Sequence, residues 1–328
     1  MNITRESLIQ IARETADKSA LSDPGLVAAY LTGSLRTENP FLGNATDVDI
    51  VYVHAGEPKI RREIIALTPE IHLDIFHAPR SAYDKPRELR VHPWLGPELY
   101  DPLPLHVTRH FFEFIQAGVR DRYREPANVG ARSLRLVKEA RQAWSSLQSG
   151  RVHGPQQVLG YLRSITLAAN AVAMLTGDLL AERRFLLQFP VRARSAGQPG
   201  LAAMLLDLLG ADQVDAATLA GFLPEWEKTF LEAAALPGVD ARIAAPRLGY
   251  YELACASMLE SATPQACLWP LLLTWTLAVS VLPPVWQVRW RSACGTLGLD
   301  DGSFGGRMEG LDHFLDAVEA LQESLPGR

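Results

Sequence analysis

The chain contains few of the residues that mark specialised classes of small or secreted protein. Only three cysteines, Cys255, Cys267 and Cys294, occur among its 328 residues. That number is too small for a disulfide framework, and the three residues form no CxxC pair of the kind that holds a metal. We therefore expect reduced, mostly buried thiols and a cytoplasmic protein.

Long hydrophobic runs are also scarce. Residues 1–19 carry charges throughout and lack an apolar central segment, so we expect no signal peptide. The most apolar stretch, from Cys267 to Trp286, is interrupted by prolines. Its unbroken part falls short of the roughly 20 residues that a bilayer requires. This stretch is more typical of a buried core helix, and we expect no contact with a membrane.

An excess of basic charge is absent as well. The chain has 32 lysines and arginines against 37 aspartates and glutamates, a net charge of −5. Such a balance provides no global field for long nucleic acids, which are not expected partners. The 48% hydrophobic and 21% charged residues are instead typical of a globular protein with a sizeable core, and the length allows two domains.

The first hundred residues alternate between helical and strand patterns. Helix-like spacing of apolar residues is found at 3–19, and short β-branched or apolar runs bounded by turn residues indicate strands. We predict strands over Leu26–Thr32, Asp47–His54 and Ile71–His77, and a short amphipathic helix over Lys59–Leu67. This order predicts a mixed sheet with helices.

From about residue 105 the pattern becomes helical. We predict helices over residues 107–117, 131–147, 158–175, 201–209, 215–222, 225–235, 250–261, 268–281 and 311–324. Residues 301–310 are rich in glycine, but no strand precedes them and no GK[ST] follows, which favours a surface loop over a phosphate-binding loop. The predicted fold class is α+β, with domains at 1–110 and 111–328, the second one all-helical.

Three aspartates interrupt the apolar strands of the first domain. Asp47 and Asp49 open one predicted strand, and Asp74 lies inside the next. Residues i and i+2 of a strand point to the same face, so Asp47 and Asp49 project together. Two carboxylates at that distance repel each other unless a cation lies between them. Mg²⁺, a hard ion that prefers oxygen ligands, would answer that repulsion, and Asp74 could share the same cluster.

Each of these features also has an ordinary structural interpretation. A Gly-Ser dipeptide such as Gly33-Ser34 is often only a turn, and strand-edge aspartates are often merely solvated. Taken together the features are more informative, because three aspartates stand where strand propensity disfavours them. Local rules that are broken together tend to mark a functional site.

The combination resembles the nucleotidyltransferase superfamily typified by DNA polymerase beta. The resemblance rests on a strand followed by Gly33-Ser34, an Asp-x-Asp flanked by apolar residues at Asp47 and Asp49, and a third carboxylate at Asp74. It covers about residues 1–105. A sheet domain followed by a helical bundle is similar to small bacterial members such as aminoglycoside nucleotidyltransferases. The Arg-x4-His motif that accompanies the minimal toxin–antitoxin type is absent from the helical half.

The resemblance implies a set of roles. Asp47, Asp49 and Asp74 would be the catalytic residues and the Mg²⁺ ligands, with Asp74 completing a second metal site or accepting the acceptor's proton. The residues expected to bind the nucleotide are Gly33, Ser34, Arg36 and Thr46. Gly33 would let the backbone approach the triphosphate, and Arg36 would neutralise phosphate charge.

The implied activity is transfer of NMP, with AMP from ATP preferred, from an NTP to a hydroxyl of a small molecule or protein, with release of pyrophosphate. The helical domain would bind the acceptor. The alternative is a nucleotide-binding regulatory or antitoxin-like protein with little turnover. The sequence leaves the acceptor and the oligomeric state open, a homodimer included.

Overall fold

The computed structural model describes residues 3–108, 110–148 and 154–325, and its fold is α+β, as the sequence predicts. All strands of the described residues belong to one five-stranded sheet, in the order β3-β4-β2-β1-β5. The strands are β1 (Leu26–Leu31), β2 (Thr46–His54), β3 (Arg62–Ala66), β4 (Ile71–Pro79) and β5 (Leu103–Val107). β2 and β4 are parallel, whereas the other neighbours are antiparallel.

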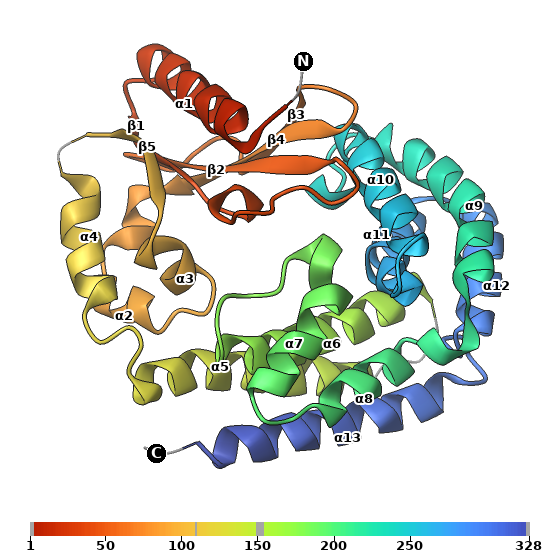
Figure 1. The fold of residues 1–328 in the computed structure, drawn as a ribbon. Helices are drawn as coiled ribbons and strands as arrows, with labels where there is room; N and C mark the ends of the chain where they lie inside the picture. The colour runs from red at the N-terminus through yellow and green to blue at the C-terminus, as the bar shows by residue number, and fades with distance from the viewer. Residues whose placement is uncertain (1–2, 109, 149–153, 326–328) are drawn as a thin grey trace.

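The helices of the first part surround this sheet. They are α1 (Arg5–Ser22), α2 (Pro86–Arg90), α3 (Leu95–Tyr100) and α4 (Phe111–Arg120). A capping box at Thr4 and Ser7 starts α1, and its buried residues recur at Leu8, Ala12 and Ala16, four positions apart. This stripe packs on one face of the sheet, where Figure 1 shows α1 above the strands. The face on the other side of the sheet is left for α2 to α4 and for the helical part.

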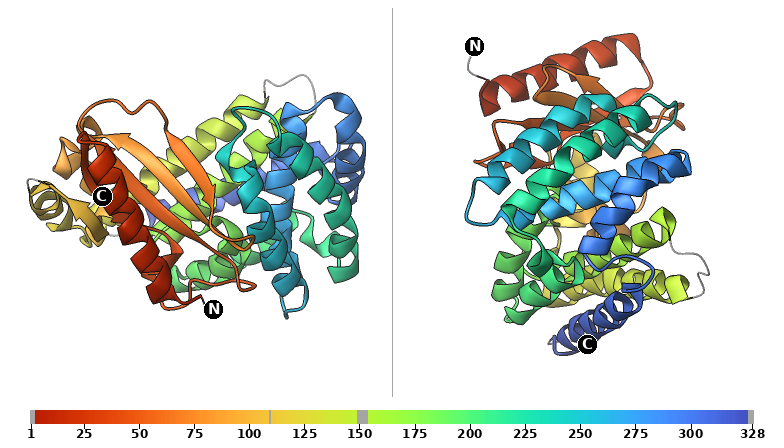
Figure 2. Two further views of the ribbon diagram at one scale, coloured as in Figure 1. Left: turned by 90° about the horizontal axis from the view of Figure 1, so that it is seen from above. Right: turned by 90° about the vertical axis from the view of Figure 1, so that its right-hand side faces the viewer.

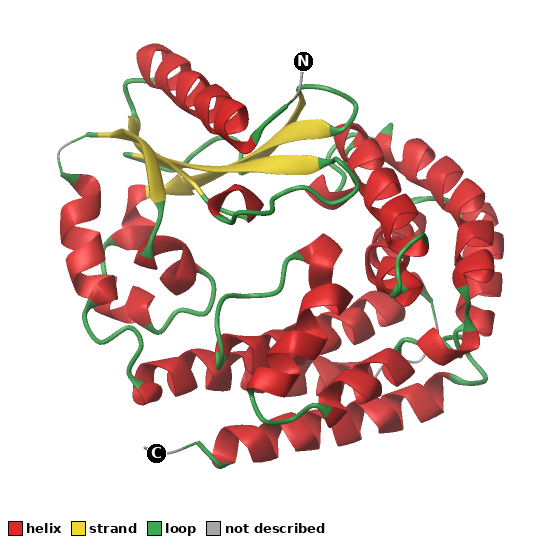
Figure 3. Cartoon of the chain, in the orientation of Figure 1, coloured by secondary structure: helices red, strands yellow, loops and turns green. Residues whose placement is uncertain are grey.

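The helical part follows as one continuous series. Its helices are α5 (Pro126–Gln148), α6 (Pro155–Met174), α7 (Phe185–Ser195), α8 (Gly200–Leu208), α9 (Ala216–Ala234), α10 (Leu248–Leu259), α11 (Leu268–Val281), α12 (Gln287–Thr296) and α13 (Phe304–Glu323). Figure 3 shows the strands gathered at one side of the molecule and these helices on the other. Figure 2 shows α1 crossing the sheet when the molecule is viewed from above.

The apolar segment near residue 270 lies in the core of the helical part. Pro264–Val281 is long and apolar enough to cross a membrane, but 78% of it is buried inside the protein. Every residue of α11 from Leu268 to Val279 is buried. The prediction of a buried core helix is therefore confirmed.

Two helix predictions are wrong, because each covers residues of an edge strand. Lys59–Leu67 was expected to be helical, but Arg62–Ala66 is the edge strand β3, because its β-branched Ile64 and Ile65 pair with β4. The helix expected at 107–117 begins only at Phe111, since Leu103–Val107 adds an edge strand to β1. Pro104 makes the sequence of this segment atypical of a strand, although an edge strand tolerates proline.

One pair of predicted helices and one predicted loop also need correction. The segments 215–222 and 225–235 form the single helix α9, which continues through Pro224. The glycine-rich stretch 301–310 is a loop only at its start, because α13 begins at Phe304. Burial of Phe304 and Leu311 against the helical core outweighs the low helix propensity of the glycines.

The division at residues 110 and 111 stays a prediction. The ring of Phe112 on α4 lies edge-on to that of Tyr30 on β1, with centroids 5.4 Å apart, so α4 packs on the sheet. The helical core, by contrast, is a separate cluster that extends from Leu136 to Leu321 and includes Ala45 from the sheet part.

Candidate functional site

The parallel pairing of β2 with β4 brings the three predicted carboxylates to one face of the sheet. Asp49 is the register partner of Asp74, and Asp47 is the partner of His72. Because adjacent residues in register point to the same side, all four side chains project from the face that α1 leaves free. Asp47, His72 and Asp74 are buried, and Asp49 is partly exposed.

The Gly33 turn passes directly against Asp49. Gly33 has a φ of 66°, and a Cβ atom placed on it would lie 1.7 Å from Oδ2 of Asp49. The backbone N–H of Thr32 donates to the backbone carbonyl of Asp49 at 2.9 Å. Only glycine fits this position, because any side chain would collide with the carboxylate.

The other predicted nucleotide-binding residues surround this turn. The hydroxyls of Ser34 and Thr46 are 3.1 Å apart, and Thr46 also donates to the Pro40 carbonyl at 3.2 Å. Thr46 is fully buried, so its visible role is to hold Ser34 and the following loop. Arg36 is half-buried, on the short 3-10 helix η1 (Ser34–Arg36).

Asp74 is enclosed by two guanidinium groups that the sequence analysis missed. Arg62 on β3 donates from Nε to Oδ1 at 2.7 Å and from Nη2 to Oδ2 at 2.6 Å. Arg247 donates from Nη1 to Oδ2 at 3.2 Å. The side chain of Arg247 is 5% exposed and that of Arg62 is 40% exposed. A two-pronged arginine–carboxylate contact is among the strongest hydrogen-bonded ion pairs.

Arg247 and Tyr250 bring the helical part onto Asp47. Arg247 ends the 3-10 helix η6 (Ala245–Arg247), and its Nη2 lies 3.7 Å from Oδ2 of Asp47. The Tyr250 hydroxyl on α10 donates to that same oxygen at 2.7 Å. Burial would raise the pKa of Asp47, but the charges of Arg183 and Arg247, together with the hydrogen bond from Tyr250, lower that pKa.

Arg183, also from the helical part, contacts Tyr250 and Ala45. It lies on the 3-10 helix η3 (Glu182–Arg184), and its guanidinium carbon is 3.3 Å from the centroid of the Tyr250 ring. It donates to the carbonyls of Tyr250 at 2.9 Å and Ala45 at 3.1 Å. The neighbouring Arg184 donates to three successive carbonyls, those of Asn39, Pro40 and Phe41. These hydrogen bonds hold the loop between Ser34 and Asp47 against the helical part.

Asp49 differs from Asp47 and Asp74, whose carboxylates accept hydrogen bonds from other side chains. No hydrogen bond or ion pair to its side chain is found among the described residues. Burial and the negative charges of Asp47 and Asp74 raise its pKa well above the usual range. Binding of a cation would offset the repulsion at a partly enclosed carboxyl that has two like charges beside it.

His72 is fully buried beside Asp47, and neither ring nitrogen has a hydrogen-bond partner within the described residues. Its ring meets Tyr250 edge-on, with centroids 4.9 Å apart. Burial lowers the pKa of His72 to about 4, so the ring is neutral at pH 7. His72 therefore lines the site as a neutral side chain beside Asp47.

A further acid lies near Arg36. Burial raises the pKa of Glu98, on α3, to about 7, although Arg36 and a hydrogen bond from Tyr30 oppose the rise. Tyr30 in turn shares a hydrogen bond of 3.0 Å with Tyr83. The α3 segment thus supplies an acid near Arg36, which follows the Gly33 turn.

The donor set fits Mg²⁺ only in part. Among the described residues, no hydrogen bond reaches either oxygen of Asp49 or Oδ1 of Asp47, and carboxylates are the ligands that Mg²⁺ prefers. Both oxygens of Asp74 already accept from arginine. Within the described ranges, no group of three or more His, Cys, Asp or Glu lies close enough to hold a metal ion.

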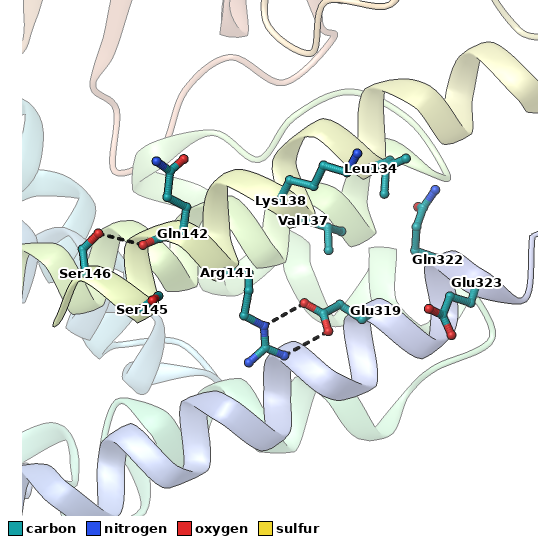
Figure 4. A pocket seen from close by; sticks show the side chains of 10 residues that line it. All are labelled: Leu134, Val137, Lys138, Arg141, Gln142, Ser145, Ser146, Glu319, Gln322 and Glu323. Carbon is teal, nitrogen blue, oxygen red and sulfur yellow. Dashed lines mark hydrogen bonds and ion pairs between the residues drawn. The ribbon is translucent and has the colours of Figure 1, made fainter. Parts of the chain in front are cut away.

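A hollow in the described part of the chain lies elsewhere. It has a volume of about 540 Å³ and lies between α5 and α13, as Figure 4 shows. Arg141 crosses it to form ion pairs with Glu319 and with Asp312 and Asp316 on α13. None of the predicted site residues lines this hollow, so it is separate from the candidate site.

Comparison with solved structures yields distant likenesses. The crystal structure of a nucleotidyltransferase-like protein from Exiguobacterium sibiricum matches with 11% sequence identity, covering 77% of this chain and 76% of that one, at a TM-score of 0.27. At that TM-score the likeness does not by itself establish a shared fold. No protein-family profile and no curated protein matches the chain.

Proposed function

We propose that this protein is a Mg²⁺-dependent nucleotidyltransferase that moves NMP, AMP from ATP first, to a hydroxyl of a small molecule or protein. One observation carries the proposal: the Gly33 backbone lies against Asp49, beside Asp47 on the same strand face. A turn without side-chain bulk next to paired carboxylates can bring phosphate oxygens and a cation together.

The reaction can be written with residues of this chain. The acceptor hydroxyl oxygen forms a bond to the α-phosphorus, the bond from that phosphorus to the β-bridging oxygen breaks, and pyrophosphate leaves. Asp47 and Asp49 would hold Mg²⁺, which when bound supplies positive charge to the phosphates. The Ser34 hydroxyl and Arg36 would donate to phosphate oxygens, and a carboxylate of the site would take the hydroxyl proton.

The helical part has two roles in this proposal. Arg183, Arg184 and Arg247 position the loop and the carboxylates. The surface that α10 and its neighbours add beside the sheet would bind the acceptor. We further propose a cytoplasmic setting, in line with three buried free cysteines.

The decisive experiment measures pyrophosphate release from each NTP, with and without Mg²⁺, in the presence of hydroxyl acceptors that include aminoglycosides. Wild-type protein and the variant Asp49→Asn are compared, and the control is Asp301→Asn on an exposed turn. We expect Mg²⁺-dependent release that Asp49→Asn abolishes and Asp301→Asn leaves intact. Failure of Mg²⁺–ATP to bind at all, measured by calorimetry, would refute the proposal.

A second candidate function has one specific observation in its favour. Arg62 and Arg247 donate hydrogen bonds to the carboxylate of Asp74. This arrangement would also fit a site that binds nucleotide without catalysing its transfer. The pyrophosphate assay separates the two: a regulatory protein would bind nucleotide, release no pyrophosphate with any acceptor, and form a stable complex with another protein.

A further inference from the structure

We propose that Asp74 is not a metal ligand but a positioning residue, which holds Arg62 and Arg247 as a binding site for the phosphates of the substrate. The protein would then bind one divalent ion, on Asp47 and Asp49. This inference rests on the proposed function and assigns a substrate-binding role to two residues that the sequence pattern does not mark.

The first support is the occupancy of the Asp74 oxygens. Arg62 binds both of them through a fork, at 2.7 and 2.6 Å, and Arg247 adds a third contact at 3.2 Å. Metal ligation through either oxygen would place a divalent cation next to two guanidinium charges. Like charges at such distances repel strongly, and the side chain of Asp74 is only 3% exposed, so little water would screen them.

The second support is the charge balance of the site. Three carboxylates, on Asp47, Asp49 and Asp74, face three guanidinium groups, on Arg62, Arg183 and Arg247. The site is thus close to neutral before any ion binds. The guanidinium groups thus already balance the carboxylate of Asp74, and the charge of one divalent ion on Asp47 and Asp49 remains available to the phosphates of the substrate.

The third support is that both arginines have N–H donors that do not contact Asp74. A guanidinium has five N–H donors, and Arg62 directs only Nε and Nη2 at Asp74. The Nε of Arg247 is buried without a hydrogen-bond partner, and its Nη2 lies 3.7 Å from the nearest Asp47 oxygen. Two arginines with spare, oriented donors suit the tetrahedral oxygens of phosphate.

The fourth support is that two distant elements supply these arginines. Arg62 comes from edge strand β3, and Arg247 comes from η6 in the helical part. Contacts between β3 or β4 and η6 join these elements around Asp74. A carboxylate that holds cations from both parts fixes their spacing before a ligand arrives, which is the use of a positioning residue.

Binding of Mn²⁺ alone to the full chain, followed by electron paramagnetic resonance, tests the metal half of the inference. We expect one ion per chain in the wild type, loss of binding in Asp49→Asn, and an unchanged affinity in Asp74→Asn and Arg62→Gln. If Asp74 were a ligand, Asp74→Asn would weaken Mn²⁺ binding by roughly tenfold or more. Arg62→Gln would then strengthen binding or admit a second ion, and either result would overturn the inference.

Inorganic tripolyphosphate, titrated by calorimetry in buffer with EDTA, tests the phosphate half. We expect both Arg62→Gln and Asp74→Asn to weaken its binding by about tenfold, the size of one lost charge-assisted hydrogen bond. Unchanged binding in both variants would overturn the inference. Arg62 is 40% exposed, so Arg62→Gln should fold even if Asp74→Asn does not, which circular dichroism checks.

These probes contain no nucleoside, so they separate the inference from the proposed function. If the protein binds tripolyphosphate through its arginines but releases no pyrophosphate from any NTP, the proposed function fails and the inference stands. If it releases pyrophosphate while Asp74→Asn loses Mn²⁺, the inference fails and the function stands.

Discussion

Asp49 illustrates how a single residue can be costly in the folded protein and yet remain in place. Its pKa is raised by burial and by the charges of Asp47 and Asp74, and its side chain has no partner among the described residues that would offset this. Charged groups held in this way destabilise the fold and are typical of functional sites. By contrast, Asp47 is compensated by Tyr250 and by nearby arginines.

We therefore predict that Asp49→Asn stabilises the protein in EDTA at pH 7 by about 1–3 kcal/mol. A raised folded-state pKa means that the native state loses stability as pH rises through that pKa, and the amide removes this loss. Urea unfolding at pH 7 measures it. Asp47→Asn should have the opposite effect, because it leaves Tyr250 and Arg247 without their carboxylate. Equal destabilisation by both variants would contradict the prediction.

Glu98 provides a second prediction at the scale of one residue. Burial raises its folded-state pKa to about 7, above the value of an exposed glutamate, so the native state binds the proton more tightly. Its contribution to stability is full below about pH 4.5 and is lost as pH rises through about 7.

Accordingly, Glu98→Gln should stabilise the protein relative to wild type at pH 8 by about 1–3 kcal/mol and make little difference at pH 5. Urea denaturation at the two pH values measures the difference. Glu57→Gln, at an exposed turn, is the control and should show no such pH dependence. A Glu98→Gln effect of the same size at both pH values would contradict a titration of this carboxyl.

At the scale of elements, the Gly33 turn packs so closely against β2 that only glycine fits in the turn. A short 3-10 helix follows the turn, and the next strand carries both carboxylates. The positive φ and the 1.7 Å contact that a Cβ would make both require glycine at this position.

Gly33→Ala should destabilise the fold by about 1–3 kcal/mol and abolish nucleotide binding, because the turn must move away from Asp49. Gly56→Ala is the matched control, since a Cβ there meets nothing within 4 Å. Thermal unfolding and ATP calorimetry report the two effects. Normal ATP binding by Gly33→Ala would show that the turn does not contact the nucleotide.

At the scale of the whole molecule, the sheet part and the helical part are joined through the site itself. Arg183 donates to backbone carbonyls in both parts, at Ala45 and at Tyr250, while its charge lowers the pKa of Asp47. Its removal would leave these buried acceptors without donors, which costs free energy wherever water cannot replace the donor.

We expect Arg183→Met to lower the free energy of unfolding by about 2–4 kcal/mol and to weaken ATP binding. Arg289→Met, on an exposed face of α12, controls for the loss of one positive charge and should change stability by less than about 0.5 kcal/mol. Urea unfolding compares the two variants. If Arg183→Met unfolded like the control, the coupling of the two parts would not depend on Arg183.

The elements that carry the three aspartates could be predicted from local sequence. Apart from their aspartates and histidines, β2 and β4 are rich in apolar and β-branched residues, and Gly33 stops β1, so short-range patterns suffice. The edge strands β3 and β5 could not be identified in this way. An edge strand obtains its stability from pairing with a neighbour rather than from its own composition, and one of them contains Pro104.

What the sequence by itself determined is therefore the α+β class, the buried helix α11, and the position of the aspartates on adjacent strands. Only the tertiary structure decided what those aspartates contact. Arg247 lies 173 residues from Asp74 in the chain, and Tyr250 lies 203 residues from Asp47. No local pattern encodes such pairs, because they depend on how the helical part packs against the sheet. Packing thus places Asp74, which the sequence predicts to be a metal ligand, between the guanidinium groups of Arg62 and Arg247.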